Sequence, residues 1–163
     1  MKKLIITIML AMPIIASAQK FGHINSQELF MQMPEIAAVE DSIAKERENY
    51  TRLLNDMQEE YKKKVQDYQA KQASMSEAIR QINEEDIYNL QQRIQTTYQV
   101  AEQDIQKKQQ DLLAPIHEKM TKAIKAVGDR EGFTYIFDSV GLVHIGASAT
   151  DITPAVKKEL GIK

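Results

Sequence analysis

The sequence predicts an α+β fold that is mostly α, in which a long antiparallel coiled-coil hairpin arm extends from a small β body that oligomerises. Two observations carry this prediction. Residues from Glu35 to Ala114 form 80 consecutive positions with neither Gly nor Pro, although the 163-residue chain has six glycines and four prolines. Within this segment apolar residues recur at intervals of three and four, whereas the flanking segments contain short aromatic and β-branched runs.

The first 18 residues have the pattern of a secretory signal peptide, with cleavage expected between Ala18 and Gln19. Two lysines precede a short apolar run, and three small residues follow it. The run is too short to span a bilayer, which needs about 20 residues. The alternative is a buried N-terminal helix. We therefore expect export to the periplasm of a Gram-negative cell, and a mature chain without stable membrane insertion.

The segment 34–131 is interpreted as a hairpin of two long helices. Met33–Glu35 provides a proline and an acid for the first turn. One helix of about 100 residues would be unusual, so we expect a reversal near 74–86, where Ser and Asn favour turns. The acidic run Glu84–Asp86 suits the start of the second helix. Pro115 interrupts that helix while the apolar period continues, which predicts a kink rather than an end.

Residues 19–33 and 132–163 flank the arm and form the predicted body. Three strands are expected, at Lys20–Ile24, Phe133–Asp138 and Leu142–Ile145, and the last two are expected to pair as a hairpin.

Capping patterns mark the short helices of the body. Asn25 followed by Glu28 predicts one helix start. Thr153 as the N-cap, with Pro154 at the first position, predicts another, and Gly161 should end that helix.

The body is too small to be stable by itself. It has 47 residues and the chain has no cysteine, whereas single cores below about 70 residues rarely fold without disulfides, metals or partners. No plausible structural metal site is found in it. Oligomerisation is the remaining source of stability, and short strands leave sheet edges that need a partner.

Catalytic and cofactor-binding patterns are missing from the sequence. The three histidines lack metal-ligand spacing, and a grouping of Asp138, Ser139 and His144 lies across one tight turn without a nucleophile elbow. A glycine-rich phosphate loop is also missing, so nucleotide-driven action is not expected. The net charge of −2, or −4 after removal of the two leader lysines, disfavours nucleic-acid binding. We expect no enzyme activity and no cofactor.

The order of these segments resembles the Skp/OmpH family across the whole mature chain. That order runs through Leu112–Ile116, Gly132–Asp138 and Asp151–Gly161, of which Leu112–Pro115 and Asp151–Thr153 are the more specific parts. The resemblance implies a jellyfish-like homotrimer, whose β body carries three hairpin arms around a cavity. It also implies an ATP-independent holdase that keeps unfolded outer-membrane proteins from aggregating.

Two sets of residues are candidates for function. The body residues expected to hold the trimer together are Phe21, Ile24, Phe133, Tyr135, Ile136, Phe137, Val143 and Ile145. The sheet period places Phe133, Tyr135 and Phe137 on one face. The arm residues that are candidates for client contact are Tyr61, Tyr68, Met75, Ile79, Tyr88 and Tyr98. Most of the arm tyrosines are nevertheless expected to belong to the seam between the helices, because they fall on its period.

The arm departs from the family in its charge. Better-known members are strongly basic, and a lipopolysaccharide-binding patch has been proposed on their arms. From Glu35 to Glu131 this chain has 15 basic and 19 acidic residues, a net charge of −4. This balance disfavours lipopolysaccharide binding and strong electrostatic capture of clients.

Other functions remain open at this point. A structural coiled-coil adaptor of the envelope would share the arm pattern but would lack chaperone activity. A prefoldin-like cytosolic holdase is opposed by the signal peptide, and an enzyme by the missing polar site.

Overall fold

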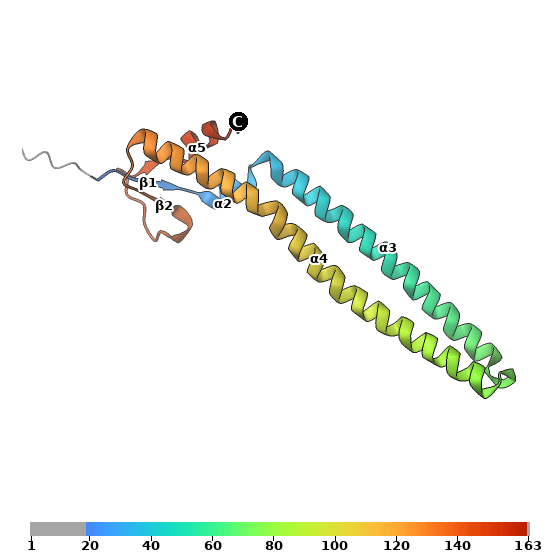
Figure 1. The fold of residues 1–163 in the computed structure, drawn as a ribbon. Helices are drawn as coiled ribbons and strands as arrows, with labels where there is room; N and C mark the ends of the chain where they lie inside the picture. Colours follow the sequence, from blue (N-terminus) through green and yellow to red (C-terminus); the bar gives the residue numbers. More distant parts are fainter. Residues whose placement is uncertain (1–18, 163) are drawn as a thin grey trace, which may run out of the picture. The chain divides into compact units, whose positions relative to one another are not determined.

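The computed structural model describes residues 19–162 and confirms the mostly helical α+β fold, with two long helices and a small sheet (Figure 1). It divides into two compact units. The body unit comprises the described residues through Leu29 together with Lys122–Gly161. The arm unit comprises Phe30–Thr121. The signal peptide and its cleavage after Ala18 lie outside the described residues.

The sheet of the body unit is parallel and joins segments far apart in the sequence. β1 (Phe21–Ile24) lies between β2 (Tyr135–Asp138) and β3 (Thr150–Asp151). In the register of β1 and β2, Phe21 is opposite Tyr135 and Ile24 is opposite Asp138. Parallel neighbours need a long connection, and here the whole arm connects the two strands.

The expected hairpin of Phe133–Asp138 with Leu142–Ile145 is wrong. β2 is followed by the 3-10 turn η2 (Ser139–Gly141), and the third strand lies later, at Thr150–Asp151. The side chain of Asp138 accepts a hydrogen bond from the amide of Val140 at 3.1 Å. This bond stabilises a tight turn, but the residues after the turn do not return along β2, which pairs with β1. The β-branched residues after the turn have a high strand propensity, but the tertiary context outweighs this propensity and they form no strand.

Two short helices belong to the ends of the chain. Before α2 (Ser26–Met31), the amide of Glu28 donates to the Asn25 side chain at 2.9 Å, and the Asn25 side chain donates to Glu28 at 3.3 Å. This reciprocal pair confirms the predicted cap.

The C-terminal helix α5 (Thr153–Glu159) begins differently from the prediction. Ile152 occupies the N-cap position and Thr153 is already helical. The hydroxyl of Thr153 is used in contacts with other segments, and Asp151 accepts from the Thr153 amide at 2.8 Å. Gly161, at φ 72°, follows the helix as predicted.

Glycine permits close packing on the inner face of the sheet. A Cβ on Gly22 would lie 3.0 Å from the ring of Phe133 and 3.1 Å from Ile152. A Cβ on Gly128 would lie 2.8 Å from Ile136. The most deeply buried large side chains of the body unit surround this layer: Leu29, Val127, Ile152 and Val156.

The arm unit contains α3 (Pro34–Lys71) and most of α4 (Glu77–Glu131), which run antiparallel and reverse through η1 (Gln72–Ser74) (Figure 1). The expectation that the second helix begins at Glu84–Asp86 is wrong. The Ser76 hydroxyl accepts from the amide of Ile79 at 3.4 Å, so this earlier residue takes the capping position.

α4 continues through Pro115, as the unbroken apolar period predicts. The kink itself stays a prediction. α4 ends at Glu131 because Gly132 follows at φ 72° and the amide of Phe133 bonds back to the carbonyl of Gly128 at 2.9 Å.

The seam between the arm helices is thin. Apart from Met33, the buried apolar side chains of the arm unit are Ile36, Val39, Ile43, Leu54, Met57, Leu90, Ala101, Ile116 and Met120. Within each helix, neighbours in this list are three, four, 11 or 15 residues apart, which are steps of three and four and their sums, as in a coiled-coil seam. Most of the remaining arm surface is therefore polar.

Candidate functional site

An aromatic surface on the sheet is the first candidate site. The rings of Phe21, Tyr135 and Phe137 lie 6.0–6.2 Å apart, centre to centre, and 45–54% of each residue is exposed. They share one face because β1 and β2 are in parallel register and side chains alternate along each strand. We call these three residues the aromatic face. Exposed aromatic side chains gathered in this way are typical of protein interfaces.

Phe133 does not belong to the aromatic face, contrary to the expectation. It precedes β2, and its ring lies where a Cβ of Gly22 would point, which is the opposite side of the sheet. The ammonium of Lys20 lies 3.9 Å from the ring centre on that side. Ile24 is buried and Ile136 half-buried, and both alternate with the exposed residues of the aromatic face.

The other two body residues singled out from the sequence lie outside any strand. Val143 is fully exposed and Ile145 is 40% exposed, and both belong to the segment between β2 and β3. A role for them in assembly stays a prediction.

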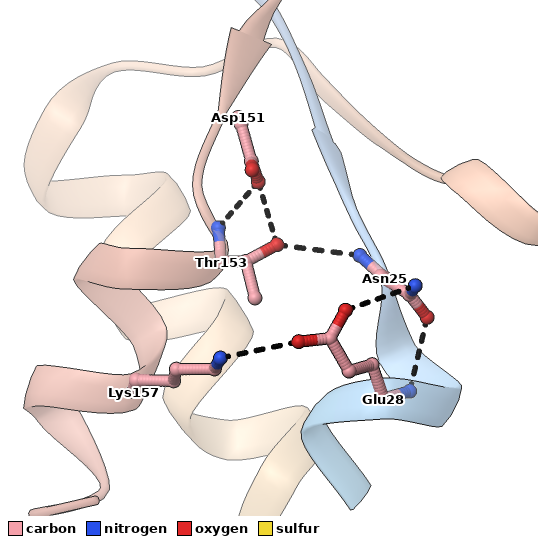
Figure 2. Close-up of polar contacts among 5 residues, drawn as sticks. All are labelled: Asn25, Glu28, Asp151, Thr153 and Lys157. Carbon is pink, nitrogen blue, oxygen red and sulfur yellow. Dashed lines mark hydrogen bonds and ion pairs between the residues drawn. The ribbon is translucent and has the colours of Figure 1, made fainter. Parts of the chain in front are cut away.

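A polar network fastens the two ends of the body unit together (Figure 2). The hydroxyl of Thr153 donates to Asp151 at 2.5 Å and accepts from the backbone amide of Asn25 at 3.3 Å. Lys157 forms an ion pair with Glu28 at 3.4 Å. Thr153 is 7% exposed, so its bonds are partly shielded from water. The network holds the segment after β1 against α5.

Two carboxyl groups of the body unit have altered acidity. Burial would raise the pKa of Asp151, but the hydrogen bonds from Thr153, helped by His23 and Lys157, hold that pKa below its ordinary value. A hydrogen bond from the Ser26 hydroxyl lowers the pKa of Asp138, and burial opposes this effect. Both carboxylates serve as structural acceptors.

Within 19–162, no group of three or more His, Asp or Glu side chains is placed to hold a metal ion. Asp138 is engaged by Ser26 and Val140.

Polar contacts cross between the arm helices in a regular order. The phenol of Tyr50 donates to Asp104 at 2.5 Å, and the amide side chain of Gln58 donates to the phenol of Tyr98 at 2.8 Å. Tyr68 donates to Glu84 near the tip. These partners are 54, 40 and 16 residues apart, which traces the antiparallel register.

The six client-contact candidates therefore fall into two groups. Tyr61, Tyr68 and Met75 are half-buried along the hairpin, which agrees with the seam interpretation. Ile79, Tyr88 and Tyr98 are 48%, 60% and 46% exposed. Tyr98 nevertheless has its hydroxyl bonded across the arm. Contact with a client stays a prediction for all six.

Sequence reasoning missed a groove on the arm unit. It has a volume of about 620 Å³, and its lining includes Phe30, Met31, Ile43 and Leu113. Met31 is 62% exposed. The consecutive leucines before Pro115 were a usable signal, because one helix cannot direct two adjacent side chains into a single seam.

A membrane-spanning segment was also sought. Among residues 19–162, no helix is both long and apolar enough to cross a bilayer.

Comparison with known proteins gives a consistent result. A family model described as outer membrane protein (OmpH-like) matches residues 20–160. The chain is 27% identical over 146 residues to chaperone protein Skp of Pectobacterium atrosepticum, covering 90% of this chain and 88% of that protein. It is 27% identical over 144 residues to chaperone protein Skp of Photorhabdus laumondii, covering 88% and 87%.

A solved structure shares the fold. It comes from Caulobacter crescentus and is described as that of an OmpH-like outer membrane chaperone. The TM-score is 0.76 at 13% identity, and the match covers 87% of this chain and 83% of that chain.

Proposed function

Because the chain belongs to the OmpH-like outer membrane protein family, we propose that it is an ATP-independent periplasmic holdase that binds unfolded outer-membrane proteins and prevents their aggregation. The observation that carries this proposal is the family match, which extends through both units, from residue 20 to 160. Relatives that align with most of the chain bear the name chaperone protein Skp.

The proposed working form is a homotrimer built through the body. Its support is the aromatic face, whose three rings are about half exposed in the single chain. β2 and β3 are also the outer strands of the sheet, and outer strands offer unpaired backbone groups. The number three comes from the family resemblance.

The proposed mechanism is the holding of clients between the arms by many weak contacts. The arms present polar, flexible side chains with exposed apolar residues between them, including Ile79, Tyr88 and Val100. Weak contacts add up when a cage raises the effective concentration of client segments. Because the arm is net acidic, salt should weaken binding less than in a strongly basic relative.

The chaperone function is tested by aggregation of a urea-unfolded outer-membrane barrel protein, diluted with and without the mature protein. Suppression without ATP is expected, and it should be lost when both arms are cut back to near Met57 and Ile105. Suppression that needs ATP, or that survives this truncation, contradicts the mechanism. No suppression by the intact protein would favour the structural adaptor instead.

Assembly is tested separately by Phe137→Asp, measured by the mass of the protein in solution. An unpaired charge inside an apolar interface is costly, so the variant should dissociate. Thr134→Asp, an exposed change just before β2, serves as the control. A trimer of unchanged stability in Phe137→Asp contradicts the proposed interface.

Export is tested by sequencing the N-terminus of the protein recovered from the periplasm. The mature chain should begin at Gln19. A full-length cytosolic product contradicts the proposed localisation.

A further inference from the structure

The geometry points to a client subsite in the groove of the arm unit, which takes a short, extended, uncharged segment with apolar or aromatic side chains. This inference rests on the proposed chaperone function and locates one of its contacts. The occupant is a strand segment of an unfolded outer-membrane barrel protein.

The groove lies on the side of α4 that carries Gln109 and Leu113, in the turns just before Pro115. Proline has no amide hydrogen, so the carbonyl of Asp111 loses its usual partner, and the proline ring crowds that turn. The two preceding leucines are both half-buried. Leu113 lines the groove of about 620 Å³, and Leu112 lines a second hollow of about 360 Å³. The seam therefore leaves apolar surface uncovered on the two sides of this leucine pair.

The lining suits apolar side chains. Buried seam residues Ile36, Val39 and Ile43 contribute to it. Phe30 also lines the groove, and its ring is held by stacking on His117 at 4.1 Å between centres. Met31 is 62% exposed, and a flexible thioether side chain adapts to differently shaped partners.

The charge of the lining selects an uncharged occupant. Its two charged residues are Glu40 and Arg47, which cancel, and Gln109 adds a neutral polar group. This balance contrasts with an arm that has 34 charged residues from Glu35 to Glu131. A charged client segment would gain no net attraction here and would lose hydration.

The length of the groove fits a short strand. From Ile36 to Arg47 along α3 the rise is about 16 Å at 1.5 Å per residue. About five extended residues cover the same distance, so two or three alternate side chains could enter together. Strands of membrane barrels alternate lipid-facing apolar residues with polar ones and carry aromatic residues near their ends. Such a segment would place its apolar side chains inward and its polar ones toward Glu40 and Arg47.

Site-specific crosslinking tests this inference directly. Met31 is replaced by the photoreactive residue p-benzoylphenylalanine in the mature, assembled protein, and a urea-unfolded outer-membrane barrel protein is diluted into it. Gln99 is replaced in the same way as the control, because it is an exposed arm residue that neither lines the groove nor belongs to the client-contact candidates. Efficient crosslinking at Met31, mapped by mass spectrometry to lipid-facing strand segments, is expected.

A matched pair of substitutions gives the affinity. Leu113→Gln should weaken client binding by about tenfold, since loss of one leucine-sized apolar contact is worth about that factor. Leu53→Gln, at an exposed arm residue outside the groove, should change binding less than about twofold. Circular dichroism checks that both variants retain the arm helices.

The inference is overturned if Met31 crosslinks to clients no better than Gln99, if it crosslinks to another copy of the chain, or if the client segments it captures are charged. Equal losses from Leu113→Gln and Leu53→Gln also overturn it. These failures differ from failure of the chaperone proposal, in which the unmodified protein would not suppress client aggregation at all.

Discussion

The body unit and the arm unit obtain their stability in different ways. In the body unit Val127, Ile152 and Val156 are 0–1% exposed, and Thr153 bonds to residues on both ends of the chain. In the arm unit the buried seam side chains described above are 3–9% exposed, and many cross-arm bonds lie in contact with water. The stability of the body depends on a few long-range contacts, so it should be sensitive to single substitutions. The stability of the arm is distributed over many similar seam positions, so each substitution there should matter less.

The largest difference is expected for deletion of core side chains. Ile152→Ala should lower the free energy of unfolding by about 3 kcal/mol, because it leaves a cavity in a fully buried site. Ile105→Ala, at a half-buried arm position, should cost about 1 kcal/mol. Urea unfolding at one fixed protein concentration measures both, since assembly contributes to stability. Equal costs would contradict the distinction between the two units.

A smaller difference is expected for the loss of one hydroxyl. Thr153→Val removes an acceptor for the Asn25 amide and a donor to Asp151, and should cost about 2 kcal/mol because two part-buried hydrogen bonds are lost. Thr97→Val is the matched arm change, since the Thr97 hydroxyl only donates to the Arg93 carbonyl of its own helix. That change should stay within about 0.5 kcal/mol. The midpoints of thermal unfolding compare the two, and Thr153→Ser should restore most of the loss.

Acid should weaken the body unit selectively. The folded pKa values of Asp138 and Asp151 are lowered from the ordinary 3.8. Folding therefore favours the ionised carboxylates, and their contribution is complete above about pH 5 and lost as the pH falls through and below 3.8. Asp151→Asn should lower the melting temperature at neutral pH, and its difference from the unaltered protein should shrink toward pH 3. Asp56→Asn on the exposed arm surface controls for the loss of charge. A difference that stays constant with pH would contradict this role of Asp151.

The smallest difference is expected between exposed ion pairs. Lys108–Glu46 of the arm has side chains 36% and 29% exposed, and Arg130–Glu159 of the body has side chains 54% and 36% exposed. Double-mutant cycles should give less than about 1 kcal/mol for each, with the arm pair slightly stronger. Added salt should reduce both values. An interaction energy of several kcal/mol for the body pair would contradict this expectation, because surface ion pairs would then stabilise the two units to different extents.

The sequence predicted the arm correctly because its signals are local. Neither Gly nor Pro occurs from Glu35 to Ala114, and apolar residues recur there at intervals of three and four. Both signals predict long helices that pack against each other along one apolar stripe, as α3 and α4 do. Pro34 and Gly132 mark the beginning of α3 and the end of α4. The start of α4 was misplaced because an acidic run is compatible with several positions in the first turns of a helix.

The body was predicted less accurately because strand pairing is not local. The segment Leu142–Ile145 has the residues of a strand, yet β3 lies at Thr150–Asp151. Likewise, Phe133 has the spacing of the aromatic face but lies on the opposite side of the sheet, since it precedes β2. Neither outcome follows from the segments concerned, because both depend on β1, more than 100 residues earlier.

The sequence by itself determined that the chain is a mostly helical hairpin with a small mixed body, and its segment order was sufficient to identify the family. Periodicity, capping pairs such as Asn25 with Glu28, and helix-ending glycines act within a few residues, so they can be interpreted without a fold. Only the tertiary structure decided that β1 lies at the centre of a parallel sheet and that Thr153 fastens the two ends of the chain. It also decided that a groove opens beside Leu113. These features depend on which segments, distant in the sequence, pack against each other. Several segments have a suitable local sequence, and tertiary packing decides which of them pair.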